Sequence, residues 1–218
     1  MKSKIVRIGI YFASIFMVVV FSSALEQKER ITIYTIGDST MADKDTVGNP
    51  ERGWGQALSL YFDMRKVRIE NHAKNGRSTK SFIDEGRWDA VVDKLKKGDY
   101  VFIQFGHNDE KRQSPDRYTD PRGAYKANLT RFVNETRVKG AYPVLMSPIV
   151  RRHFDESGHL IDTHGEYPEA VRQLSEELNV PFIDMESKSR KMIERLGPED
   201  SKRLFVWFEA GEYPRFPE

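Results

Sequence analysis

Cysteine is absent from the 218 residues of this sequence. Its absence excludes disulfide bonds, thiolate metal sites, a cysteine nucleophile and a lipid-modified N-terminal cysteine. An excess of charge of one sign is lacking as well. Three of the 35 basic side chains lie within residues 1–24, which leaves 32 basic against 33 acidic side chains in the rest of the chain. This balance gives no indication of a nucleic-acid partner or of binding to an anionic membrane.

Several common functional motifs are also missing. The sequence contains no Gly-x-Ser-x-Gly nucleophile elbow, no phosphate-binding loop and no His-Glu-x-x-His zinc helix. Gly53 and Gly55 lack the third glycine and the preceding strand of a dinucleotide-binding turn. His159, Asp162 and His164 are compatible with a metal site, but their irregular spacing in one loop favours solvated histidines. We therefore expect no metal and no cofactor.

Long hydrophobic runs are absent too. The longest, Ile8–Phe21, has 14 residues, whereas a membrane-spanning helix needs about 20. This run follows a basic start, and Ser22-Ser23-Ala24 places small residues at the −3 and −1 positions of a cleavage site. Residues 1–24 are predicted to be a secretory signal peptide, with an uncleaved anchor helix as the alternative. The protein is thus expected to be secreted or periplasmic, without stable membrane association after cleavage.

Strand and helix patterns alternate five times in the remainder, residues 25–218. Strands are predicted at 31–36, 67–71, 100–105, 141–148 and 180–184, and helices at 57–62, 83–97, 122–139, 167–178 and 187–196. No break in composition separates these elements. The pattern favours a single α/β domain with three layers, α/β/α, around a five-stranded parallel sheet.

Polar side chains follow two of the predicted strands at the point where each strand ends. The first strand leads into Gly37-Asp38-Ser39, and the third into Gly106-His107-Asn108-Asp109. Open α/β folds hold their sites at the carboxyl edge of the sheet, so Ser39 and Asn108 are expected to face one cleft. We interpret Ser39 as a nucleophile; the alternative is that Asp38 and Ser39 only cap a helix or form a turn.

A third loop follows the second predicted strand. Asn75-Gly76 is a turn signal, and Ser78 or Thr79 can begin a helix. A glycine before a helix start exposes backbone N–H groups, which favour a developing negative charge. An ordinary loop explains the same residues, so Gly76 is a candidate donor on local grounds only.

Three blocks taken together resemble the SGNH (GDSL-type) hydrolases and, among them, the rhamnogalacturonan acetylesterase-like group. The blocks are Gly37–Met41, Asn71–Ser78 and Gly106–Asp109, and Arg52–Gln56 and Asp162–Pro168 resemble the same group. The resemblance covers nearly all of the predicted mature chain. It implies a flavodoxin-like fold and a secreted serine ester hydrolase that removes O-acetyl groups from a plant cell-wall polysaccharide such as pectin.

The resemblance also implies a role for individual residues. Ser39 would attack the ester carbonyl, and the backbone N–H groups of Ser39 and Gly76 with the Asn108 amide would hold the oxyanion. Asp38 and His107 would support these groups. The expected partner is an acetylated polysaccharide or oligosaccharide, and the oligomeric state stays open.

The family's general base is missing from this sequence. In the family, the base and its orienting carboxylate come from a late Asp-x-x-His block before a final helix. No such block follows Trp207, and no histidine follows His164. Asp162-Thr163-His164 has the wrong spacing. We therefore expect a chain truncated before the block, without its C-terminal helix, and with impaired activity.

Two other functions stay open. A GDSL-type lipase or thioesterase would use the same machinery with a long apolar groove, although the charged loops at 111–122 and 151–153 argue mildly against it. A catalytically dead carbohydrate-binding protein agrees with the missing histidine, whereas the retained nucleophile and oxyanion residues favour an enzyme. Trp54, Trp88 and Trp207 are candidates for stacking on sugars, but their apolar neighbours favour core positions.

Overall fold

The computed structural model describes residues 30–207 and 211–213. The predicted signal peptide, residues 1–24, lies outside these residues, and export stays a prediction. Within the described ranges, no helix combines the length and the apolar character needed to cross a bilayer.

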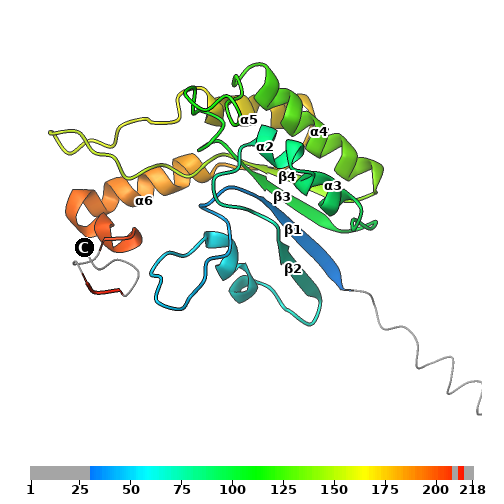
Figure 1. Ribbon diagram of the computed structural model, residues 1–218, viewed down its shortest axis with the longest axis horizontal. Coiled ribbons are helices and arrows are strands. Elements are labelled where there is room, and N and C mark those ends of the chain that lie inside the picture. Colours follow the sequence, from blue (N-terminus) through cyan, green and yellow to red (C-terminus); the bar gives the residue numbers. More distant parts are fainter. Residues whose placement is uncertain (1–29, 208–210, 214–218) are drawn as a thin grey trace, which may run out of the picture. The chain divides into compact units, whose positions relative to one another are not determined.

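Five parallel strands form one sheet in the order β2-β1-β3-β4-β5 (Figure 1). Their bounds are β1 Ile31–Gly37, β2 Val67–Asn71, β3 Tyr100–Gln104, β4 Tyr142–Met146 and β5 Phe182–Ile183. Gly37 is in register with Gln104, so β1 and β3 end side by side. From β1 the chain moves first to β2 on one side and then back to β3 on the other. Such a reversal leaves a crevice at the carboxyl ends of the strands.

Helices lie on both faces of this sheet. One face is covered by α2 Thr79–Asp84, α3 Arg87–Val92, α4 Ala124–Val138 and α5 Tyr167–Glu177 (Figure 1). The 3-10 helix η1 Trp54–Tyr61 and helix α6 Met185–Asp200 line a common hollow on the other side, and the short 3-10 helix η2 Ser201–Leu204 follows α6. The predicted α/β/α arrangement with five parallel strands is confirmed.

The main core lies between the sheet and the α2–α5 layer. Trp88, Phe82, Phe105 and Phe132 are fully buried in it. Phe82 meets Phe105 edge to face, with the ring centroids 5.4 Å apart, a geometry that adds about 0.5–1.5 kcal/mol beyond area burial. Tyr125 Oη also donates a hydrogen bond to the carbonyl oxygen of Phe105. Phe105 directly precedes the Gly106–Asp109 loop, so the core fixes the point from which this loop leaves β3.

The predicted helix over 83–97 is wrong as a single element. Gly86 has a φ of 68° and separates α2 from α3, which ends at Val92. A glycine reaches this left-handed conformation without the clash of a Cβ atom. Gly197, with a φ of 71°, likewise interrupts α6 where the sequence predicts its end, but a further turn continues to Asp200.

The tryptophans divide between core and surface. Trp88 is fully buried and Trp54 half-buried, whereas Trp207 is 60% exposed, so the prediction of a core position is wrong for Trp207. The Arg152 guanidinium and the Lys202 ammonium each lie 5.1 Å from a Trp207 ring centroid. Cations over an indole face are attracted to its negative quadrupole, which accounts for the position of this ring at the surface.

Candidate active site

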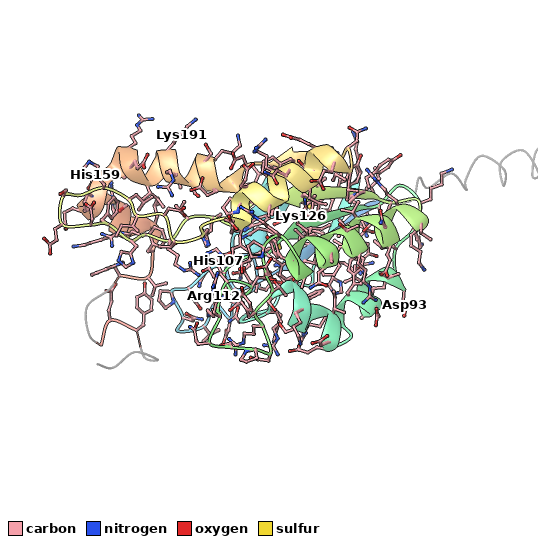
Figure 2. All side chains as sticks on the ribbon, turned by 90° about the horizontal axis from the view of Figure 1, so that it is seen from above. Asp93, His107, Arg112, Lys126, His159 and Lys191 are labelled. Carbon is pink, nitrogen blue, oxygen red and sulfur yellow. The ribbon has the colours of Figure 1, made fainter. Side chains whose placement is uncertain are left out.

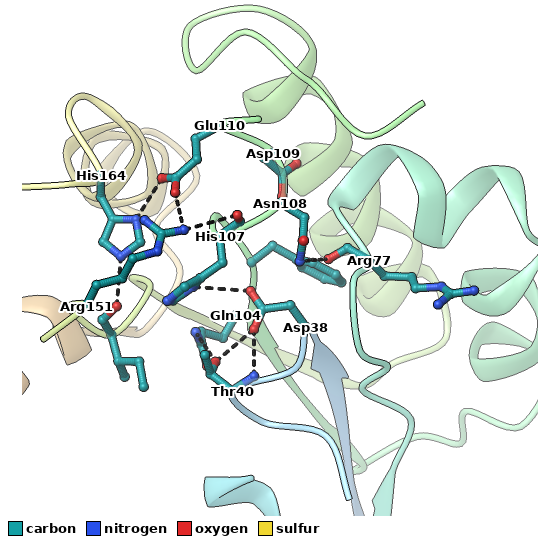
Figure 3. Close-up of polar contacts among 12 residues, drawn as sticks. Asp38, Thr40, Arg77, Gln104, His107, Asn108, Asp109, Glu110, Arg151 and His164 are labelled. Atoms are coloured by element: carbon teal, nitrogen blue, oxygen red, sulfur yellow. Dashed lines mark hydrogen bonds and ion pairs between the residues drawn. The ribbon is translucent and has the colours of Figure 1, made fainter. Parts of the chain in front are cut away.

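The loop after β1 places a buried carboxylate beside Ser39. Asp38 is fully buried, and its Oδ1 accepts hydrogen bonds from the backbone N (2.9 Å) and Oγ1 (2.8 Å) of Thr40. Its Oδ2 lies 3.4 Å from Nδ1 of His107, which follows β3 (Figure 3). The contact therefore joins the ends of the two neighbouring strands.

Asp38 is negatively charged at neutral pH. Burial raises the pKa of its carboxyl, but the charge of His107 and the Thr40 hydrogen bonds outweigh burial and hold the pKa below its ordinary value. A buried charge of this kind is costly unless it is paired. The Thr40 hydrogen bonds and the nearby His107 ring therefore offset the cost of burying the Asp38 carboxylate.

The buried side-chain amide of Gln104, at the end of β3, contacts the same turn. Gln104 is fully buried; its Nε2 donates to Thr40 Oγ1 (3.1 Å), and its Oε1 accepts from Trp54 Nε1 (2.7 Å). A Cβ atom at Gly37 would lie 2.5 Å from the Gln104 carbonyl oxygen. Only glycine lets β1 and β3 approach this closely, which explains the Gly in Gly-Asp-Ser.

Ser39 itself is partly exposed. Its hydroxyl makes no hydrogen bond to any side chain within 30–207 or 211–213. The Ser39 hydroxyl is thus not engaged by another side chain, and no described residue is placed to accept its proton.

The loop after β2 brings Gly76 to this end of the sheet. Gly76 has a φ of 78°, which favours glycine. The side chain of Ser78 then caps α2 by accepting a hydrogen bond from the backbone N of Ser81, as the sequence predicts. Between them, the carbonyl oxygen of Arg77 accepts a hydrogen bond from Asn108 Nδ2 at 3.1 Å (Figure 3). This bond ties the Gly76 loop to the loop after β3.

Asp109, which is fully buried, also connects the loop after β3 to the start of α2. Its Oδ1 accepts hydrogen bonds from Thr79 N (3.0 Å), Thr79 Oγ1 (2.6 Å) and Thr119 Oγ1 (2.7 Å). Its Oδ2 is buried without a partner among the described residues. Burial is the main cause that raises the pKa of Asp109 to about 7. Sequence reasoning gave this residue no role, because Thr79 and Thr119 become its neighbours only in the folded chain.

A second polar cluster packs behind His107. His164 Nδ1 lies 2.8 Å from Glu110 Oε2, and His164 Nε2 lies 2.8 Å from the carbonyl oxygen of Ile149 (Figure 3). Arg151 pairs with Glu110 and donates to the carbonyl oxygen of His107 (3.2 Å). The His164 ring meets the His107 ring edge to face at 4.6 Å. The cluster therefore positions His107.

This burial corrects the sequence interpretation of one loop. His164 is only 3% exposed, so the prediction of a solvated histidine is wrong for it. The prediction holds for His159, whose side chain is 82% exposed. Within the described parts of the chain, no three His, Cys, Asp or Glu side chains gather in a way that would hold a metal ion.

The loops that carry the predicted site residues lie at one edge of the sheet. Asp38 contacts His107, Ser39 follows Asp38, and Asn108 contacts the residue next to Gly76. A hydroxyl, glycine-loop N–H groups and a carboxamide at one edge are the groups that acyl transfer requires of a nucleophile and its oxyanion donors.

Known proteins are similar to this chain in sequence and in fold. Residues 35–204 match the GDSL-like Lipase/Acylhydrolase family. The chain is 44% identical over 191 residues to "Rhamnogalacturonan acetylesterase RhgT" of Bacillus subtilis (strain 168). The aligned residues make up 88% of this chain and 80% of that protein. The chain is 36% identical over 180 residues to "Probable rhamnogalacturonan acetylesterase YesY" of the same strain, over 83% and 80% of the two chains.

Solved structures have a similar fold. Protein YXIM_BACsu from Bacillus subtilis matches with a TM-score of 0.73 at 27% identity, over 82% of this chain and 50% of that chain, so this chain spans half of that relative. Axe2, an acetylxylan esterase from Geobacillus stearothermophilus, shares the fold with a TM-score of 0.60 at 21% identity, over 81% and 84%. The family match includes all three strand-end loops described above. This chain therefore belongs to the GDSL-like lipase/acylhydrolase family of ester hydrolases.

Proposed function

We propose that the chain is a serine esterase that removes O-acetyl groups from a plant cell-wall polysaccharide of the rhamnogalacturonan type. The observation that carries this proposal is the similarity to two relatives named for that activity, along four-fifths of their length. Ser39, Gly76 and Asn108 lie within the aligned family region. Their position at one sheet edge supports the same chemistry.

The proposed reaction proceeds through an acetyl-serine. Ser39 Oγ attacks the acetyl carbonyl carbon, and the carbonyl oxygen becomes an oxyanion. The backbone N–H groups of Ser39 and Gly76 and one N–H of Asn108 Nδ2 stabilise that oxyanion, each contributing roughly 3–4 kcal/mol to the transition state. The sugar hydroxyl then leaves with a proton, and water releases acetate from Ser39.

The general base is the component that the described residues do not supply. Ser39 needs an acceptor for its proton, and the acceptor needs an orienting group. Asp38 already engages His107, and His164 is bound at both ring nitrogens. We therefore propose that the 218-residue chain, assayed as it stands, hydrolyses esters slowly.

Acetate release from a matched set of polymers tests the proposed substrate. The chain is expected to release acetate faster from acetylated rhamnogalacturonan than from acetylated xylan of equal acetyl content, with imidazole added as an external base. The measurement is enzymatic determination of free acetate over time. Equal rates on the two polymers would contradict the proposal, and tight binding without any release would indicate a carbohydrate-binding protein.

An apolar hollow favours the second candidate, a lipase or thioesterase. Its volume is about 320 Å³, and Trp54, which bonds Gln104 in the site, forms part of its wall. The remaining lining is mostly apolar, from Ile149, Val150, Met185, Met192, Ile193, Leu204 and Phe205. When release of 4-nitrophenol is measured, 4-nitrophenyl acetate is expected to be hydrolysed faster than 4-nitrophenyl decanoate. The reverse order would favour the lipase.

Loss of the Asn108 carboxamide is expected to lower kcat about 10²-fold or more, because it removes one oxyanion donor. The measurement compares kcat and KM of Asn108→Ala with those of the unchanged chain on 4-nitrophenyl acetate. Asn134→Ala, on the exposed side of α4, is the matched control. An unaltered kcat in Asn108→Ala would remove Asn108 from the oxyanion hole.

A further inference from the structure

The Asn108 carboxamide can work as an oxyanion donor in only one of its two orientations. With Nδ2 toward the reacting carbon, it donates a hydrogen bond; flipped by half a turn, it presents Oδ1 and repels the oxyanion. Asn108 is almost fully buried. Its orientation must therefore be set by the protein groups that contact the two ends of the amide.

Two contacts set it. At one end, Nδ2 donates to the carbonyl oxygen of Arg77 at 3.1 Å (Figure 3). At the other end, Oδ1 accepts a hydrogen bond from Lys111 Nζ, also at 3.1 Å. In a flipped amide, Oδ1 would face the Arg77 carbonyl and the NH₂ group would face an ammonium. Both contacts would then be repulsive, so the pair selects the donating orientation.

The same contacts leave one donor for the reaction. A carboxamide nitrogen carries two N–H groups, and one is used by the Arg77 carbonyl. Within the described residues, Nδ2 has no second acceptor. The positive charge at Oδ1 also draws electron density from the amide nitrogen, which strengthens the remaining N–H as a donor.

Local backbone geometry brings Lys111 into place. The Lys111 backbone N donates to the Asn108 carbonyl oxygen at 3.3 Å, and Ser114 N donates to the Lys111 carbonyl oxygen at 2.8 Å. The lysine thus belongs to a turn that begins at the residue it orients. Its side chain is partly exposed, so replacing it removes a contact without opening the core.

We propose that Lys111 is a positioning residue of the oxyanion hole, whose ammonium holds the Asn108 carboxamide with Nδ2 toward the reacting carbon. The inference rests on the proposed function, because it presumes that Asn108 stabilises the oxyanion. Lys111 acts only through Asn108 and does not itself touch the reacting atoms.

Lys111→Met should lower kcat about tenfold, the effect of losing a hydrogen bond to a charged group, and leave KM nearly unchanged. Lys111→Arg should recover most of the kcat, because a guanidinium also donates to Oδ1. In an Asn108→Ala chain, Lys111→Met should have no further effect. Lys191→Met is the matched control, on α6 and away from His107 (Figure 2). A loss confined to KM, or an additive loss in the double variant, would overturn the inference.

Binding of methylboronic acid provides a readout that does not depend on turnover. The Ser39 oxygen forms a bond to boron and releases its proton to solvent, which gives a tetrahedral boronate anion resembling the oxyanion. Lys111→Met should raise the Kd for the boronic acid about tenfold. The melting temperature of the protein should not change. Equal Kd values for the Lys111→Met variant and the unchanged chain would overturn the role of Lys111 but would not affect the proposed function. An unchanged chain that neither binds the boronate nor hydrolyses esters would overturn the proposed function as well.

Discussion

A chain carrying Ser39→Ala is expected to lose all the ester hydrolysis that added imidazole stimulates. Imidazole supplies the proton acceptor that no described residue offers to the Ser39 hydroxyl. An activated hydroxyl forms the acetyl intermediate, and alanine cannot form it. With rising imidazole, hydrolysis of 4-nitrophenyl acetate by the unchanged chain should increase. The variant should stay at the rate of imidazole buffer without protein.

The intermediate itself gives a second measurement. After incubation with the ester, peptide mass spectrometry should find an acetyl group on Ser39 of the unchanged chain. Ser59→Ala, at an exposed position of η1, is the matched control and should behave as the unchanged chain does. If Ser39→Ala retains stimulated hydrolysis, Ser39 is not the nucleophile. If the unchanged chain is fast without imidazole, the proposal of slow turnover is wrong.

Asp109→Asn is expected to make the chain more stable above pH 7. Burial moves the pKa of this carboxyl from 3.8 to about 7. Between these values the unfolded chain has lost the proton while the folded chain keeps it, so the free energy of unfolding falls as pH rises through this window. A shift of this size corresponds to roughly 3–5 kcal/mol. Asparagine retains Oδ1 as an acceptor for Thr79 and Thr119 but carries no charge.

Urea unfolding between pH 4 and pH 8.5 measures this effect. The stability difference between Asp109→Asn and the unchanged chain should favour the variant increasingly as pH rises from about 4 to about 7 and then level off. Asp93→Asn, at an exposed carboxylate (Figure 2), is the matched control and should leave the pH profile unaltered. Parallel profiles for Asp109→Asn and the unchanged chain would show that Asp109 does not hold its proton in the folded state.

The fold could be predicted from local patterns wherever burial and spacing act together. The apolar run ending at Phe105 and the alternation before Gly37 each produced the strand that the sequence indicates, in a parallel sheet. The pattern failed at Gly86, because an amphipathic face continues through 83–97 while one positive φ breaks the helix. The periodicity of a sequence indicates which side chains are apolar, but it does not indicate a positive φ angle at a single residue.

The sequence predicted only those site residues that directly follow the end of a strand. Ser39 and Asn108 could be placed together because parallel strands end at one edge. The partners that hold them there could not. Lys111, Asp109 and His164 are charged or polar residues in loops, where solvation is the ordinary expectation. Only the folded chain brings Glu110 to His164, or Thr79 and Thr119 to Asp109.

The strand order has a consequence for synthesis of the protein. The strand that precedes Ser39 lies between β2 and β3, and the loop bearing Asn108 emerges only after β3. During translation the proposed nucleophile, Ser39, therefore leaves the ribosome ahead of Gly76 and Asn108, the residues proposed to stabilise the oxyanion. Under the proposed mechanism, Ser39 and the Asn108 donor come together only when β3 has inserted next to β1, so formation of the centre of the sheet also brings the nucleophile to its oxyanion donor.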